Sequence, residues 1–329
     1  GQATGYLLVP GSAEAFEFDV DKAIVKNIVK FPKIRNDSRG YDIAIANTGK
    51  LLIAQGESVL EVNASDMKLI KTNPLLPNFS GLWNFILSKD QTRLYSIWTN
   101  ERGPPNTFIA INRANYQVEA RVKLEGGGFN SRPYELPDGS KLYVLGGYDW
   151  GSITVHVIET NNYTIKKTIT YEPPAEFGKL GISVGDTHPF AYDSNSHTIF
   201  MGAGTVVLAV NTDTDEIRHV IYLRDVAKAI GLQPEQFVYV NAHGLVYQPQ
   251  ENYLYIAHGD RSFASIYDLN NNSFLPKAIP LKGYFPKLAF TNDDYSKIYA
   301  VNALSDSISV IDVKSKTVEK VIDLHAYLQ

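Results

Sequence analysis

Short runs in which apolar and polar residues alternate, separated by polar turns about every ten residues, cover most of the 329-residue chain. The clearest stretch is KIYAVNALSDSISVIDVKSKTVEKVIDL, residues 297–324, where two polar turns join three such runs. Alternation with a period of two predicts β-strands that bury one face. Long helical patterns are nearly absent, and DVAKAIGL at residues 225–232 is the one short helix expected. The pattern therefore predicts an all-β protein.

The same order of runs recurs along the chain, and each complete copy begins with one further apolar strand. The N-terminal copy lacks that first strand. The copies occupy approximately residues 5–32, 40–76, 80–124, 130–173, 187–223, 242–281 and 284–324.

One four-stranded sheet cannot cover both of its own faces, so neighbouring copies must pack face to face around an axis, and closing the ring removes exposed edges. An array of β-sandwiches is the alternative, but it does not predict such similar four-strand units. The repeats predict a single domain over residues 1–329, an all-β seven-bladed β-propeller with four antiparallel strands per blade. We expect the chain ends to close the ring, with the tail HAYLQ supplying the missing strand or lying near it.

The last copy resembles a known repeat family. Its YAVN and SISVIDVKSKTVEKVI segments are similar to the YVTN family of β-propeller repeats, found in bacterial and archaeal proteins, many of them exported or on the cell surface. Other copies have YIAH, YVLG, YSIW and FMGA in place of YAVN. The incomplete first copy, opening on YLLV, is similar to the quinohemoprotein amine dehydrogenase β-subunit superfamily, whose propeller helps to enclose a redox subunit. These resemblances imply architecture more than activity.

Composition excludes several classes of function. The chain has no Cys, which rules out disulfides, thiolate catalysis and Cys-based metal sites. The net charge of −4 is spread without long single-sign runs, so nucleic acid is not expected as a partner. No run of 18 apolar residues exists, so no membrane-spanning segment is expected. The N-terminus GQATGYLLVP lacks signal-peptide features, so any such peptide is expected to have been removed or never present.

Glycosylation sequons favour an extracellular, cell-surface or periplasmic location. The five sequons are at Asn36, Asn63, Asn78, Asn162 and Asn271.

Propellers place ligands on the face formed by the loops that enter the first strands and by the turns between second and third strands. The positions entering the first strands are Tyr41, Trp83, Ser131, His188, His243 and Pro286. The positions in the second-to-third-strand turns are Gln55, Trp98, Gly146, Ala203, His258 and Asn302. All three tryptophans, including Trp150, are expected on this face.

Two chemical functions fit these positions. In the first, His188, His243 and His258 hold a divalent transition metal, with Asp186 or Asp260 nearby, since imidazole suits such ions. No tight spacing enforces this set, and no cofactor is certain.

In the second, lactonase-like hydrolysis uses His188 or His243 as general base, with Arg132 or Lys287 stabilising an oxyanion. A triad of Ser131, His188 and Asp186 can be written, but Ser131 lacks a GxSxG motif. A subunit associated with an amine dehydrogenase is a related alternative, and whether the chain is an enzyme stays open.

Recognition is the preferred function. Aromatic rings and a guanidinium at the channel mouth would bind a protein, peptide or glycan ligand through stacking and charge-assisted hydrogen bonds, as a binding module or scaffold subunit. The side chains expected to bind are Tyr41, Trp83, Trp98, Trp150 and Arg132. The plain structural alternative is that His188 and His243 simply begin strands while the aromatic rings cover the mouth.

Overall fold

Seven antiparallel sheets account for the 28 strands found in the part of the chain that the structure describes. The computed structural model describes residues 4–8, 14–32, 40–46, 49–55, 58–74, 85–98, 106–125, 129–147, 152–174, 189–233 and 241–328. The contacts between residues divide the chain into two compact units, Gly1–Val144 with His156–Thr168, and Leu145–Val155 with Ile169–Gln329.

Three sheets, the first three blades, belong to the first unit. The first is β1 (Thr4–Leu8), β2 (Glu14–Asp19) and β3 (Ile24–Lys30). The second is β4 (Gly40–Ala46), β5 (Lys50–Gln55), β6 (Ser58–Asn63) and β7 (Leu69–Pro74). The third is β8 (Phe85–Leu87), β9 (Arg93–Trp98), β10 (Asn106–Asn112) and β11 (Val118–Leu124).

The boundary between the units passes through the fourth blade. This sheet consists of β12 (Phe129–Asn130), β13 (Tyr134–Glu135), β14 (Lys141–Gly147), β15 (Ile153–Glu159) and β16 (Thr164–Tyr171).

Blades 5, 6 and 7 belong to the second unit. Blade 5 is β17 (Phe190–Asp193), β18 (Thr198–Ala203), β19 (Val206–Asn211) and β20 (Glu216–Tyr222), followed by the helix α1 (Asp225–Ile230). Blade 6 is β21 (Gly244–Gln248), β22 (Tyr253–His258), the 3₁₀ turn η2 (Gly259–Arg261), β23 (Phe263–Asp268) and β24 (Ser273–Pro280). Blade 7 is β25 (Pro286–Thr291), β26 (Lys297–Asn302), β27 (Ser307–Asp312) and β28 (Thr317–Asp323), followed by the 3₁₀ helix η3 (Leu324–Tyr327).

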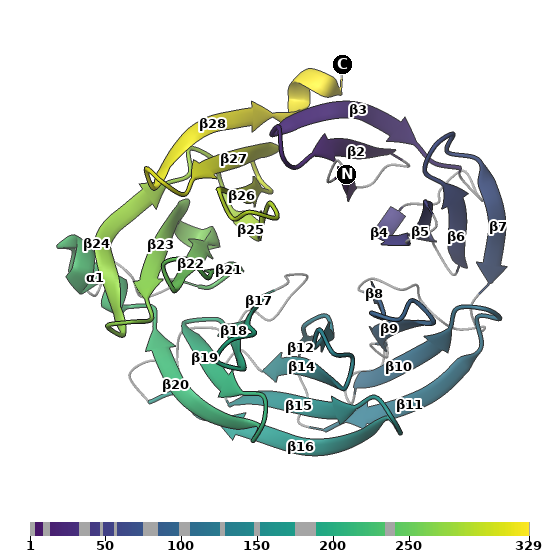
Figure 1. Ribbon diagram of the computed structural model, residues 1–329, viewed down its shortest axis with the longest axis horizontal. Coiled ribbons are helices and arrows are strands. Elements are labelled where there is room, and N and C mark those ends of the chain that lie inside the picture. Colours follow the sequence, from purple (N-terminus) through teal and green to yellow (C-terminus); the bar gives the residue numbers. More distant parts are fainter. Residues whose placement is uncertain are drawn as a thin grey trace. The chain divides into compact units, whose positions relative to one another are not determined.

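Within the second unit the blades pack face to face. The first strands β17, β21 and β25 contact one another in order, while β20, β24 and β28 form the opposite, outer side, with α1 against β24 (Figure 1). Successive residues of a middle strand therefore face different neighbours. In β22, Leu254 and Ile256 pack against blade 5, whereas Tyr255 packs against blade 7. Burial on both faces explains why such strands read as continuous apolar runs.

One turn geometry recurs in all seven blades just before the outermost strand, which is β3 in the three-stranded first blade. Each turn has one non-glycine residue in the left-handed region, with φ between 51° and 57°. These residues are Ala23, Met67, Tyr116, Tyr163, Asp215, Asn272 and Lys316. Six of the seven turns begin with Asp or Asn four residues earlier, and in the last blade Asp312 Oδ2 accepts from the Ser315 N–H at 2.9 Å. The Asp or Asn side chain at the first position thus stabilises the turn, so its left-handed position does not need a glycine.

The sheets confirm the predicted fold class, an all-β seven-bladed β-propeller. The first sheet has three strands, as the sequence predicts, and the other blades have four principal strands. The predicted short helix is α1, which ends at Gly231 with φ 76°. The prediction of a single domain over residues 1–329 stays a prediction.

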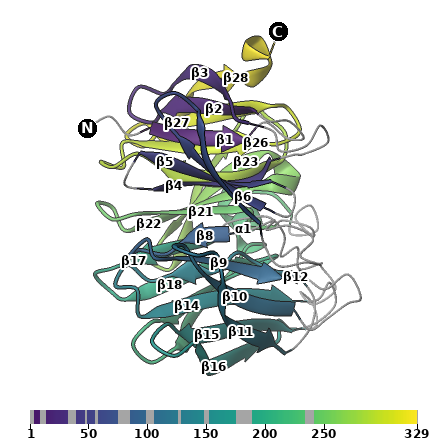
Figure 2. The ribbon, with the colours of Figure 1, turned by 90° about the vertical axis from the view of Figure 1, so that its right-hand side faces the viewer.

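The described part of the C-terminal tail is helical. Leu324–Tyr327 is the helix η3, which continues from β28 (Figures 1 and 2), so the described part of the tail adds nothing to the three-stranded first sheet. Among the residues that the structure describes, no helix is long and apolar enough to cross a bilayer.

Candidate functional site

Several side chains expected at the binding face lie outside the described residues. Trp83, Trp150 and His188 are among them, and so is Asp186. The backbone of Tyr41, Trp98 and Lys287 lies in strands, but their side chains are not described. The stacking prediction, the three-histidine metal site and the Ser131 triad therefore stay predictions.

The repeat alignment located the ends of the second strands correctly. Gln55, Ala203, His258 and Asn302 are the last residues of β5, β18, β22 and β26. All four are fully buried, so they do not present their side chains to solvent. The polar side chains of Gln55, His258 and Asn302 instead form hydrogen bonds within the protein.

Polar side chains of the middle strands bond to the carbonyl that follows the outer strand of the preceding blade. Gln55 Nε2 donates to Pro32 O at 3.2 Å, and His156 Nε2 lies 2.9 Å from Glu125 O. In blade 7 the Ser309 hydroxyl donates to Leu281 O. These hydrogen bonds connect neighbouring blades. Because each one satisfies a carbonyl group at a blade junction, the polar residues have a structural role.

Two predicted metal-site histidines, His243 and His258, come together in blade 6. The His258 Nε2 atom lies 2.6 Å from the Ser265 hydroxyl, and its ring stacks on Phe263 at 4.7 Å between centroids. Complete burial and the neighbouring His243 ring lower the pKa of His258 to about 3. His258 is therefore neutral at physiological pH.

His243 packs closely against the backbone of Gly259, where a Cβ atom would overlap its ring, and the ring also meets Phe285 edge to face at 5.1 Å between centroids. Within the described ranges, no three His, Cys, Asp or Glu side chains are grouped so that they could hold a metal ion. The described environment of the pair is thus one of packed rings and a serine hydroxyl.

Ser131 is fully buried, and its hydroxyl donates to the carbonyl of Arg132 at 2.9 Å. The Arg132 side chain is half-buried.

Two large apolar side chains are exposed next to each other in blade 7, one in the loop before β25 and one in the turn between β26 and β27. Tyr284 is 69% exposed and Leu304 is 75% exposed. The Leu304 N–H donates to Tyr284 O at 3.2 Å, which places the two residues side by side. We call them the Tyr284–Leu304 patch. Sequence analysis missed it, although a leucine inside the polar turn ALSDS was a signal.

The loop that carries Tyr284 packs on the buried, hydrogen-bonded side chain of Asn302. Asn302 Nδ2 lies 3.1 Å from the Ser307 hydroxyl and 2.8 Å from the Ser309 hydroxyl, and a Cβ at Gly283 would overlap the Asn302 amide. Lys282 and Phe285, on either side, are both in the left-handed region with φ 58°. Bulky residues are rarely found there, and such strain tends to occur at binding sites.

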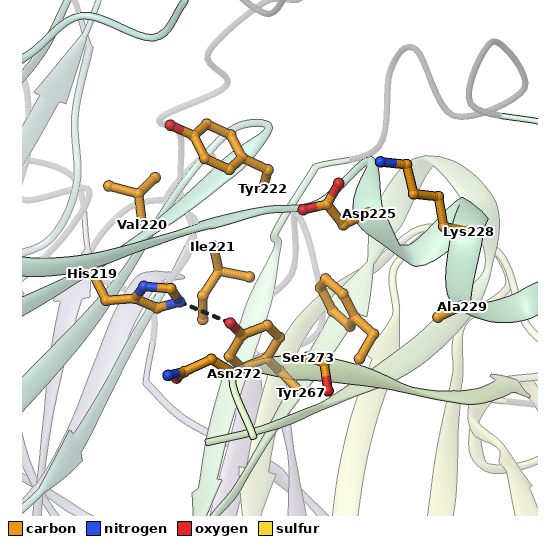
Figure 3. Close-up of a pocket in the computed structure, with 11 residues that line it drawn as sticks. His219, Val220, Ile221, Tyr222, Asp225, Lys228, Ala229, Tyr267, Asn272 and Ser273 are labelled. Atoms are coloured by element: carbon orange, nitrogen blue, oxygen red, sulfur yellow. Dashed lines mark hydrogen bonds between the residues drawn. The ribbon is translucent and has the colours of Figure 1, made fainter. Parts of the chain in front are cut away.

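A separate groove lies on the outer side of the second unit, where β20 meets α1 and blade 6 (Figure 3). We call it the rim groove. Its volume is about 520 Å³. It is lined by His219, Val220, Ile221 and Tyr222 of β20, Asp225, Lys228 and Ala229 of α1, Tyr267 of β23, and Asn272, Ser273 and Phe274.

The His219 Nε2 atom lies 2.7 Å from the Tyr267 hydroxyl inside this groove (Figure 3). Burial lowers the pKa of His219, and burial with Asp225 and Asp268 nearby raises the pKa of Tyr267 to about 12. Both groups are therefore neutral at physiological pH. Asp225 and Lys228 add one charge of each sign at the helix.

Comparison with known proteins supports the fold. No family model matches the chain, and no curated protein matches it. Among solved structures it is similar to Kuenenia stuttgartiensis hydrazine synthase, with a TM-score of 0.67 and 15% identity over 94% of both chains. It is also similar to a functionally unknown protein from Desulfotomaculum acetoxidans DSM 771, with a TM-score of 0.64 and 10% identity over 97% of this chain and 95% of that one.

A third likeness is to the dihydro-heme d1 dehydrogenase NirN, with a TM-score of 0.61 and 13% identity over 98% of this chain and 63% of that one. At these identities the likenesses show architecture alone. Together with the seven repeated sheets they define the chain as a seven-bladed β-propeller, and no particular activity follows.

Proposed function

We propose that this chain is an exported β-propeller recognition module that binds a partner protein through the loops of blade 7. The observation that carries the proposal is the Tyr284–Leu304 patch. Interfaces are dominated by a few aromatic and apolar anchors held in place before binding. Tyr284 meets both conditions, since its ring is exposed while the hydrogen bonds and close packing beneath it restrain its loop.

Export is supported by the sequons and by the resemblance to YVTN repeats. Asn162 and Asn271 are both exposed, each in a turn between third and fourth strands, where a glycan could be accommodated. The hydrolase alternative depends on His188 or His243, and His188 is outside the described residues. The amine-dehydrogenase-associated alternative depends on the resemblance of the incomplete first copy.

Selection of peptides from a random display library on the immobilised protein tests the proposal. The selected peptides should bind at least tenfold more weakly to Tyr284→Ser and Leu304→Ser. Tyr327→Ser is the matched control, because Tyr327 is also an exposed ring but lies in η3, and it should bind as the original protein does. Equal binding by all variants would place recognition elsewhere on the protein.

A further inference from the structure

The left-handed position of the recurring turn fills the space between blades in the first unit. It holds Met67 in blade 2, Tyr116 in blade 3 and Tyr163 in blade 4. Met67 and Tyr116 pack in the apolar clusters that join their own blade to the preceding one. The Tyr163 ring lies 5.9 Å from that of Tyr95 in blade 3, with 3.1 Å between the two hydroxyls. In these three blades a large side chain therefore contacts the blade before.

In blade 6 the same position holds a short polar residue, Asn272, which is exposed. Asn272 lines the rim groove, across from β20 of blade 5 (Figure 3). It also lines a second cavity of about 230 Å³, which shares His219 with the rim groove. The groove thus lies where blades 2, 3 and 4 carry a large apolar or aromatic side chain.

A glycosylation sequon is part of this turn. It consists of Asn271, Asn272 and Ser273, and the second and third of these residues line the groove. Asn271 is exposed, and its Nδ2 atom donates to Asp268 Oδ2 at 2.8 Å. This bond uses one of the two amide hydrogens, and attachment of a sugar replaces the other. A sugar on Asn271 would therefore begin at the edge of the groove.

The lining of the groove suits the first sugars of a glycan. His219 and Tyr267 are neutral at physiological pH, and an imidazole and a phenol can exchange hydrogen bonds with sugar hydroxyls. The sequon itself adds an amide and a hydroxyl group. The charges of Asp225 and Lys228 are opposite, so a neutral ligand matches the lining better than an ion. The volume of about 520 Å³ falls within the range of small-molecule sites, about 300–1,000 Å³.

We propose that Asn271 carries an N-linked glycan whose first sugars lie in the rim groove. In the transfer, Asn271 Nδ2 forms a bond to the anomeric carbon of an oligosaccharide carried on a lipid diphosphate. The bond from that carbon to the diphosphate oxygen breaks, the lipid diphosphate leaves, and the displaced amide proton is released. The glycan would fill the space that a large side chain fills in blades 2, 3 and 4. The inference rests on the export that is part of the proposed function, because this modification marks surfaces of secreted proteins.

Peptide mapping by mass spectrometry tests the modification on protein isolated from its native cells. The peptide that contains Asn271 should carry a glycan mass in most molecules. Glycan on Asn162 with none on Asn271 would overturn this inference and leave export intact. A chain with glycan at neither site would overturn the inference and also remove the sequons as support for export. Peptide selection on unglycosylated protein tests the Tyr284–Leu304 patch separately.

Enzymatic release of the glycans from the native protein measures how each one is held. Asn162 is the matched control, since it is also exposed and also precedes the left-handed residue of its turn. In protein secreted by cultured human cells, a peptide-N-glycosidase should release the Asn271 glycan at least tenfold more slowly than the Asn162 glycan. After denaturation the two rates should be equal. Equal rates in the native protein would show that the Asn271 glycan extends into solvent, and would overturn the proposal.

Two variants locate the contact in the groove. Asn272→Tyr keeps the sequon and places in blade 6 the side chain that blade 4 has at this position. Its ring should occupy the groove, so release at Asn271 should become at least tenfold faster while release at Asn162 is unchanged. Asp225→Ala combined with Lys228→Ala removes two polar groups from the groove without adding a ring, and should speed release at least threefold. Unchanged release in either variant, with the original unfolding midpoint, would overturn the proposal.

Discussion

Blades 6 and 7 fill the same buried position with different side chains. His258 ends β22 and Asn302 ends β26, and each reaches a serine hydroxyl two residues into the next strand, Ser265 or Ser309. In both blades the nitrogen atom and the hydroxyl are within 2.8 Å. His258, which departs from the repeat, therefore makes the same contact with a serine as Asn302, which fits the repeat.

The two blades differ in what this contact supports. In blade 7, Asn302 bonds to two serines and packs under Gly283, so it holds the loop that exposes Tyr284. In blade 6, His258 stacks on Phe263 and lies beside His243. A histidine at a repeat position, such as His258, is thus weak evidence for a ligand site. Asn302, the residue that fits the repeat, supports the loop that carries the exposed Tyr284.

The largest expected effect comes from Asn302→Leu. This change leaves the Ser307 and Ser309 hydroxyls without the amide in a buried site, and a buried polar group that loses its partner costs about 1–3 kcal/mol. We expect the free energy of unfolding to fall by about 3 kcal/mol in urea titrations. His258→Asn, which keeps a group able to bond to Ser265, should cost clearly less. Equal losses would mean that the two positions are not used in the same way.

Gly283→Ala should have the next largest effect. The added methyl group overlaps the Asn302 amide, and such overpacking costs about 1–3 kcal/mol. Because Asn302→Ala makes room for the methyl group, the double variant should be more stable than the sum of the two single losses predicts. Denaturant unfolding of all four proteins measures the coupling, and strict additivity would contradict the contact.

His258 of blade 6 should make the free energy of unfolding depend on pH, whereas Asn302 of blade 7 does not titrate. Its pKa is about 3 in the folded protein and about 6.5 in the unfolded chain, so the unfolded chain binds more protons between these values. Stability should therefore fall as the pH falls below about 6.5, by at most about 1.4 kcal/mol per pH unit for this one proton. His258→Asn should flatten the dependence. An unchanged slope would show that His258 is protonated within the folded protein.

The smallest effect concerns the turns between the first and second strands. Asn252 in blade 6 and Tyr295 in blade 7 are both in the left-handed region, with φ 59°. Asparagine tolerates this region better than tyrosine. Tyr295→Gly should therefore raise the unfolding free energy by up to about 1 kcal/mol, and Asn252→Gly by less. Calorimetry that ranks them the other way would show that the Tyr295 ring stabilises its turn by packing.

Repetition made the fold predictable. Seven copies of one pattern give seven sheets, and the sheet of the incomplete N-terminal copy has three strands among the residues that the structure describes. Alignment of the copies also placed Gln55, His258 and Asn302 at corresponding strand ends. It could not show that these side chains are buried, because burial depends on how neighbouring blades and loops pack in three dimensions, which the pattern within one copy does not contain.

The exposed features were not predicted for a related reason. Tyr284 lies beside Leu304, twenty residues later, only because their loops are hydrogen-bonded. The histidines suggested a metal or catalytic site, whereas Tyr284 and Leu304 belong to no motif that the sequence reveals.

The recurring turn before each outermost strand has a consequence for engineering. An Asp or Asn at the first position sets its shape in six blades, and the left-handed position accepts residues as different as Ala23, Tyr116 and Lys316. The turns should therefore be exchangeable between blades as cassettes, without altering strand register. A foreign epitope grafted into one of them would be displayed at a known orientation.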